Sequence, residues 1–179
     1  MCMSKPKDPS KELRRQEAAR QARVKEGTAQ VDNIFAQFND DFYDNRAKAQ
    51  QDYYLPQVED QYKKAYENAT YRLANSGGLT SSAGANLLGD LNKSYETNKQ
   101  RILDEAQSAA LGLRSDMAGN RANMISLLNS GNSVESVANM AKEKSMMASA
   151  MPTYSSLGDL FAQFTNQIGN SMLAGALTT

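Results

Sequence analysis

The sequence predicts an all-α fold, and three observations support this prediction. Only four prolines occur in the 179 residues, and alternating, strand-like runs are nearly absent. Aromatic residues make up 7% of the chain. The mean hydropathy of −0.62 leaves little apolar material for a thick core. We therefore expect a slender helical protein rather than a globule with a large interior.

Residues 1–27 are expected to form a basic N-terminal arm and helix. The first 26 residues carry eight Lys or Arg against four Asp or Glu. Ser10 can cap the helix, and Gly27 can end it. Two interpretations fit this helix: a solvated surface, or a basic contact with an acidic protein surface or with DNA, without sequence specificity. The residues of such a contact would be Arg14, Arg15, Arg20 and Arg23.

Residues 28–74 are expected to form two acidic helices separated by a corner. Residues 28–71 carry four basic against eight acidic side chains. The first helix would run from about Thr28 to Tyr54, with three phenylalanines on one apolar stripe. Pro56 then produces the corner, either by breaking the helix or by starting the next one. Asn75, Ser76 and two following glycines predict a turn near residues 75–81, which folds the chain back.

The stretch from Ser81 to Ser130 predicts one very long central helix. Ser81 or Ser82 can cap its start, and Gly131 sits where a helix usually stops. At 1.5 Å per residue this helix would reach roughly 75 Å, so its apolar face must pack against other helices or other copies. Four internal glycines also allow a division into shorter helices. The apolar face comprises Leu88, Leu91, Tyr95, Ile102, Ala109, Leu113, Met117, Met124 and Leu127.

Together, residues 28–130 predict an extended antiparallel helical hairpin, with the long central helix as its second arm and shorter helices before and after it. Helical spacing of apolar side chains identifies the residues expected to pack the helices or join copies of the chain. These residues are Phe35, Phe38, Phe42, Tyr62, Leu73, Leu91, Tyr95, Ile102 and Leu113.

Residues 131–179 predict a methionine-rich helix and a charge-poor C-terminal helix. The first would run from about Val134 to Ala150, with Asn132 and Glu135 at capping-box spacing. Its methionines suit either an adaptable contact surface or gap-filling in a loose core. These are Met140, Met146, Met147 and Met151.

The C-terminal helix is expected after Pro152, with Ser156 as its cap and Asp159 in its first turn. Asp159 is the one charged residue from Ser145 to the end. An apolar face opposite neutral amides suits packing among copies, and the alternative is contact with a membrane. The face comprises Leu157, Leu160, Phe161, Phe164, Ile168 and Met172.

The composition argues against catalysis. The chain has no histidine and one cysteine, Cys2, so the commonest general base and zinc sites built from Cys and His are missing. Carboxylate pairs such as Asp40 with Asp44 are routine on charged helical faces. We expect no enzyme activity and no cofactor or metal. We also expect no export signal and no membrane span, because no long unbroken apolar run occurs.

Several blocks of the sequence resemble small internal virion proteins, or ejection proteins, of short-tailed bacteriophages. The blocks are Met1-Cys2, FAQFNDDFYDNR at 35–46, YYLPQ at 53–57, LANSGGLTSS at 73–82 and SSLGDLF at 155–161. The resemblance implies storage in the virion near the portal or tail and expulsion ahead of the genome. It further implies a role in a DNA-translocation conduit across the host envelope. Implied partners are copies of itself, portal, tail or larger internal proteins, and the host envelope membrane. The alternative is a minor virion protein that is never ejected, such as a portal- or tail-bound adaptor or an internal scaffold.

Overall fold

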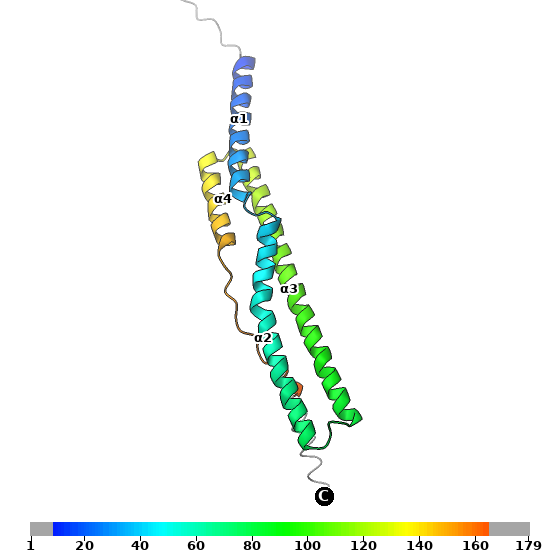
Figure 1. Cartoon of the computed structure of the whole chain (residues 1–179). Helices are drawn as coiled ribbons and strands as arrows, with labels where there is room; N and C mark the ends of the chain where they lie inside the picture. Colours follow the sequence, from blue (N-terminus) through cyan, green and yellow to red (C-terminus); the bar gives the residue numbers. More distant parts are fainter. Residues whose placement is uncertain (1–8, 165–179) are drawn as a thin grey trace, which may run out of the picture. The chain divides into compact units, whose positions relative to one another are not determined.

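A computed structural model describes residues 9–164, which form four α-helices and no β-strand (Figure 1). The helices are α1 (Pro9–Phe35), α2 (Asp40–Asn75), α3 (Ser82–Asn129) and α4 (Val134–Ser149). The predicted all-α class is confirmed for this part of the chain. The chain divides into two compact units. Unit 1 combines the residues up to Tyr43 with Leu111–Met151, and unit 2 combines Asp44–Ala110 with the residues from Pro152 onward.

The first two helices meet at a different place from the one the sequence suggested. The predicted helix end at Gly27 and new helix from Thr28 to Tyr54 are wrong, because α1 continues through Gly27 to Phe35. Asn39 then caps α2, because its side-chain oxygen accepts a hydrogen bond from the backbone N–H of Phe42 at 2.9 Å. Two acidic residues follow in the first turn of α2, where their negative charges interact favourably with the positive end of the helix dipole.

The beginning of α1 also differs from the expectation. The helix starts at Pro9, so Ser10 lies inside it instead of capping it. The Ser10 hydroxyl accepts a hydrogen bond from Arg14 Nη2 at 3.2 Å, and the Ser10 carbonyl accepts one from Arg14 Nε at 3.1 Å.

Pro56 produces no corner, because it lies inside the continuous helix α2. Proline has no backbone N–H to donate to the carbonyl of Asp52 and crowds the preceding turn. The side chain of Gln57 reaches back here, and its Nε2 donates to the carbonyl of Tyr53 at 3.0 Å. A side-chain hydrogen bond therefore supports the helix where the proline weakens it.

The long helix is confirmed as one uninterrupted element, α3. Ser81 caps it, since its Oγ accepts from the backbone N–H of Gly84 at 3.0 Å. The internal glycines do not divide it. Its buried face differs from the predicted one near positions 109 and 127. Ala109 is exposed and Leu127 is half-buried. Their neighbours Ala106, Ala110 and Leu128 are buried instead.

The turns after α2 and α3 have the same hydrogen-bond pattern. After α2, Gly78 N–H donates to the carbonyl of Leu73 at 2.8 Å, and Gly77 N–H donates to that of Ala74 at 3.2 Å. After α3, Asn132 and Gly131 donate to the carbonyls of Leu127 and Leu128 in the same way. Gly77 and Gly131 have φ of 69° and 102°, a conformation that glycine adopts at little cost. These are the Schellman ends that the glycines predict.

The last part of the described chain is mostly not helical. Helix α4 matches the predicted span, but its cap is Ser133, whose side chain accepts from Ser136 N–H, and not Asn132. The predicted helix from Ser156 is wrong for the described residues: of residues 152–164, only 162–164 are helical. Asp159 bonds locally instead, its Oδ1 accepting from Phe161 N–H at 3.0 Å.

Replacing Gly112 with alanine is expected to stabilise the protein by about 1 kcal/mol, because glycine in a helix interior costs that much relative to alanine. A Cβ at this position would meet no atom within 4 Å. Urea unfolding followed by circular dichroism measures the change. Gly77→Ala is the matched control. It should destabilise the protein, since φ at Gly77 is positive, and equal effects of the two substitutions would contradict the prediction.

Candidate functional site

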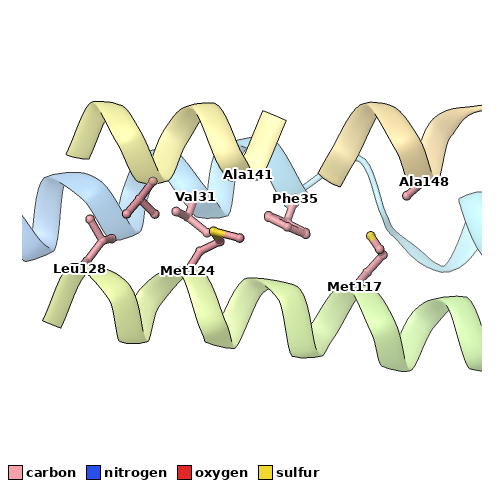
Figure 2. Close-up of a cluster of buried hydrophobic side chains, with 8 residues drawn as sticks. Val31, Phe35, Met117, Met124, Leu128, Ala141 and Ala148 are labelled. Carbon is pink, nitrogen blue, oxygen red and sulfur yellow. The ribbon is translucent and has the colours of Figure 1, made fainter. Parts of the chain in front are cut away.

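Unit 1 is held together by a thin apolar seam between α1, α4 and the last third of α3. Figure 2 shows its side chains pointing toward one another from these three helices. The seam combines a few large residues with alanines, so the helices lie close and the buried volume is small. Its buried members are Val31, Phe35, Met117, Met124, Leu128, Val137, Ala141 and Ala148.

Gly27 allows α1 to approach the end of α3. A Cβ placed on Gly27 would lie 2.6 Å and 2.8 Å from the two terminal carbons of Leu128, and 3.2 Å from Val134 Cγ2. Leu128 itself is 1% exposed, so it has little room to retreat. Gly27 is therefore a packing position within α1 and not the predicted helix end.

Polar contacts align the helices of unit 1 around the seam. The buried hydroxyl of Ser145 is bonded to the side-chain amide of Gln37. Arg121 of α3 pairs with Asp32 of α1 at 2.7 Å, and both side chains are partly exposed. Such exposed pairs contribute little stability, so we infer that this pair mainly sets the register between α1 and α3.

A small pocket of about 190 Å³ lies beside the seam, and Arg114, Arg121 and Tyr43 are among its lining residues. Arg114 pairs with Asp40 at 2.8 Å and lies 5.7 Å from the centre of the Tyr43 ring. Burial raises the pKa of Tyr43, opposed by the charge of Arg114. Both arginines are neutralised by carboxylates, which makes the pocket a poor site for an anion.

The methionines in and just after α4 divide between the two predicted roles. Met140 packs partly against the seam and fills space there. Met146, Met147 and Met151 are 65–77% exposed. Met147 also lines an open groove of about 500 Å³ that α3 and α4 share. Most of the cluster is thus exposed on the surface.

Unit 2 has its own core, in which α2 faces the first part of α3. Tyr62 of α2 stacks on Tyr95 of α3, with ring centres 4.4 Å apart, and its hydroxyl bonds to Asn92. Burial raises the pKa of Tyr62. The buried residues that α2 and α3 supply are Val58, Ala65, Ala69, Leu91 and Ile102.

The segment 152–164, which we call the strap, completes this core. Phe161 and Phe164 are 1% and 7% exposed and belong to the same cluster as Val58 and Leu91. The Phe161 ring meets the Tyr62 ring edge-on, with centres 6.1 Å apart. The surface of α2 and α3 beneath the strap, formed by Val58, Tyr62, Leu91 and Tyr95, is called the seat below.

Two glutamines of α2, one turn apart, hold the backbone of the strap. Gln57 Oε1 accepts from Leu157 N–H at 3.1 Å. Gln61 Oε1 accepts from Leu160 N–H at 2.9 Å, while its Nε2 donates to the carbonyl of Gly158 at 3.1 Å. These contacts recognise the main chain of the strap and leave the apolar side chains to enter the core.

The structure places the predicted packing residues in two separate cores. Phe35 lies in unit 1, with Phe38 and Leu113 packed partly against its seam. Leu91, Ile102, Tyr62 and Tyr95 belong to unit 2. Phe42 and Leu73 are half-buried.

The predicted C-terminal contact face is largely buried within the chain. Phe161 and Phe164 enter the unit 2 core, and Leu157 and Leu160 pack partly against it. Ile168 and Met172 lie outside the described residues. Nothing in the sequence identifies Gln57 and Gln61 as the partners of this segment, since a polar pair on a helix face does not indicate which segment it bonds.

The basic residues lie on the exposed part of α1, as the predicted contact requires. Arg14 bonds to Ser10, and Arg20 pairs with Glu17 at 2.8 Å. The remaining two, Arg15 and Arg23, are exposed. The intrahelical pairing of Arg20 supports the solvated-helix interpretation for that residue.

Glu17 provides a test of this pairing, because its hydrogen bond from Arg20, aided by one from Gln21, lowers its pKa to about 2. A lowered pKa means that the carboxylate stabilises α1 above its ordinary pKa of about 4.5, and that this contribution is lost as the pH falls towards 2. We expect the Glu17 carboxyl to titrate near 2 by NMR in the full chain. Arg20→Ala should return the midpoint towards 4.5; an unchanged midpoint would contradict the pairing.

Within residues 9–164, no three His, Cys, Asp or Glu side chains gather closely enough to hold a metal ion. Over the same range, none of the helices is both long and apolar enough to cross a bilayer.

Comparison of the chain with protein-family models, with curated proteins and with solved structures finds no match.

Proposed function

We propose that this chain is a structural protein of a virus particle that leaves with the genome and helps to build a DNA conduit across the host envelope. The observation that carries the proposal is the resemblance of its sequence blocks to internal virion proteins of short-tailed phages. The arrangement of those blocks in the structure supports it.

Two of the four resembling blocks within the described residues fall at joints between helices, and the other two take part in the contact between α2 and the strap. Residues 35–46 contain the break between α1 and α2, and residues 73–82 contain the turn between α2 and α3. Residues 53–57 contain Pro56 and the strap anchor Gln57. Residues 155–161 form most of the strap. Joints determine how helices are connected, so likeness at the joints favours a shared arrangement of helices.

We infer that α2 and α3 act as the antiparallel hairpin of this protein, with α1 and α4 as shorter partners. The turn at residues 76–81 and the Tyr62–Tyr95 stack support this arrangement. Thin cores built partly from alanine suit a protein whose helices also pack against other copies or against portal, tail or larger internal proteins. The exposed methionines of α4 are one surface for such contacts.

The experiment that tests the proposal is quantitative mass spectrometry of purified virus particles before and after DNA release. The chain should be present in full particles and depleted in emptied ones. Equal amounts before and after would show a retained adaptor or scaffold, and absence from full particles would overturn the virion assignment altogether.

The envelope contact is tested separately with liposomes, because it requires Phe161 and Phe164 to leave the unit 2 core. Purified protein should release an encapsulated dye, and Phe161→Asp with Phe164→Asp should prevent release. Intact liposomes with the unchanged protein would remove the membrane contact and leave the packing role.

A further inference from the structure

The strap is bound as a peptide would be bound, through its main chain and two buried rings. Three hydrogen bonds hold residues 157–160: Gln57 and Gln61 each accept one from the strap backbone, and Gln61 donates one to it. A fourth runs from the Tyr53 hydroxyl to the Tyr154 carbonyl at 3.3 Å. Every one of these groups lies either on α2 or on the strap, so the contacts do not depend on which chain supplies the strap.

The seat is too apolar to stay open in water. Val58 and Leu91 are 0% exposed beneath the strap, and Tyr62 and Tyr95 border them. Removing the strap would expose these side chains together with Phe161 and Phe164, at a cost of about 25 cal/mol for each Å² of apolar surface. When a molecule's own strap leaves the seat, binding of another strap of the same sequence to that seat is therefore favourable.

The connection from unit 1 into the strap is not helical. The chain passes between the two units three times: twice inside the helices α2 and α3, and once at Met151–Pro152, outside any helix. Helix α4 ends at Ser149, and Ala150 follows with φ −59° and ψ 134°, an extended conformation. In domain swapping, identical chains exchange a segment by opening a hinge at a short connector of this kind.

We propose that the seat also accepts the strap of a second copy of this chain, so that copies join by exchanging straps. The same hydrogen bonds and buried rings are then made between chains instead of within one, and assembly needs no additional surface. This inference deepens the proposed function and rests on it only for the setting in which copies meet. Its test uses purified protein, so its failure is distinct from failure of the particle experiment.

The test places single thiols on the two sides of one strap contact. The rings of Tyr53 and Tyr154 lie with centres 5.2 Å apart. In a Cys2→Ser background, one chain carries Tyr53→Cys and the other carries Tyr154→Cys. The two are mixed at high concentration and treated with a short bis-maleimide. We expect a crosslinked dimer on a denaturing gel, with a yield that rises with protein concentration.

Phe161→Asp separates strap exchange from random encounter. Placed in the chain with Tyr154→Cys, it prevents the thiol-bearing strap from seating, and the crosslink should fall at least about tenfold, given the burial of this ring. Placed in the chain with Tyr53→Cys, it leaves the thiol-bearing seat able to accept the partner's intact strap, so the crosslink should persist. This second arrangement also shows that the substituted protein retains a seat.

Two results would overturn the inference. In the first, the mixture yields no dimer at any concentration, while a single chain carrying both Tyr53→Cys and Tyr154→Cys crosslinks internally. In the second, Phe161→Asp reduces the dimer equally little in either chain, which would identify the crosslink as a chance contact.

Discussion

Replacing Phe161 with alanine is expected to destabilise unit 2 by about 3–5 kcal/mol, the usual cost of removing a buried phenylalanine ring. Phe161 is 1% exposed and contacts Tyr62 within the only cluster that joins the strap to α2 and α3 in the described residues. The substitution therefore empties the centre of that core. Urea unfolding followed by circular dichroism and by tyrosine fluorescence measures the loss.

Tyr71→Ala is the control for Phe161→Ala. Tyr71 is also a large aromatic residue of unit 2, but it is 69% exposed, so its removal should change the stability by no more than about 0.5 kcal/mol. A loss below about 1 kcal/mol for Phe161→Ala would mean that the strap is not seated in solution.

The second large effect is expected at Leu128. Leu128→Ala should destabilise unit 1 by about 2–5 kcal/mol, because a fully buried leucine leaves a cavity behind. Gly27 lies across from the removed atoms: a Cβ there would come within 2.8 Å of both terminal carbons of Leu128. Gly27→Ala should therefore be poorly tolerated alone but should restore part of the stability in the Leu128→Ala background.

A double-mutant cycle measures this coupling. The expected interaction energy between positions 27 and 128 is about 1 kcal/mol or more, favouring the double variant, as found for residues that share one cavity. Leu111→Ala, at a position 60% exposed, should have little effect. Additive effects of Gly27→Ala and Leu128→Ala would contradict the close approach of α1 and α3.

Much of the helical pattern could be predicted from the sequence because it depends on local signals. Ser81 and the two glycines with positive φ mark helix ends by their own hydrogen bonds and conformations, and the structure confirms them. Asn39 followed by two aspartates is an equally local signal for a helix start, but the periodic phenylalanines at 35, 38 and 42 predict a helix that continues across it. Those rings still contact one another: Phe38 lies 5.8 Å from Phe35 and 5.0 Å from Phe42 between ring centres.

Two further differences occur where a distant segment decides the local structure. Gly27 looks like a helix end, but its role depends on Leu128, about a hundred positions along the chain. Residues 157–161 have helical spacing, yet they are not helical, because Gln57 and Gln61 bond to backbone groups of residues 157, 158 and 160. Periodicity alone gives no information on such partners.

The side-chain amide of Gln57 makes two hydrogen bonds with different roles. Its nitrogen supports α2 beside Pro56, and its oxygen anchors Leu157. Substitutions at 56 and 57 should consequently not be independent during evolution. Loss of Gln57 would remove a support of α2 and a fixed point of attachment of the C-terminal segment in one step, without any change in that segment's own sequence.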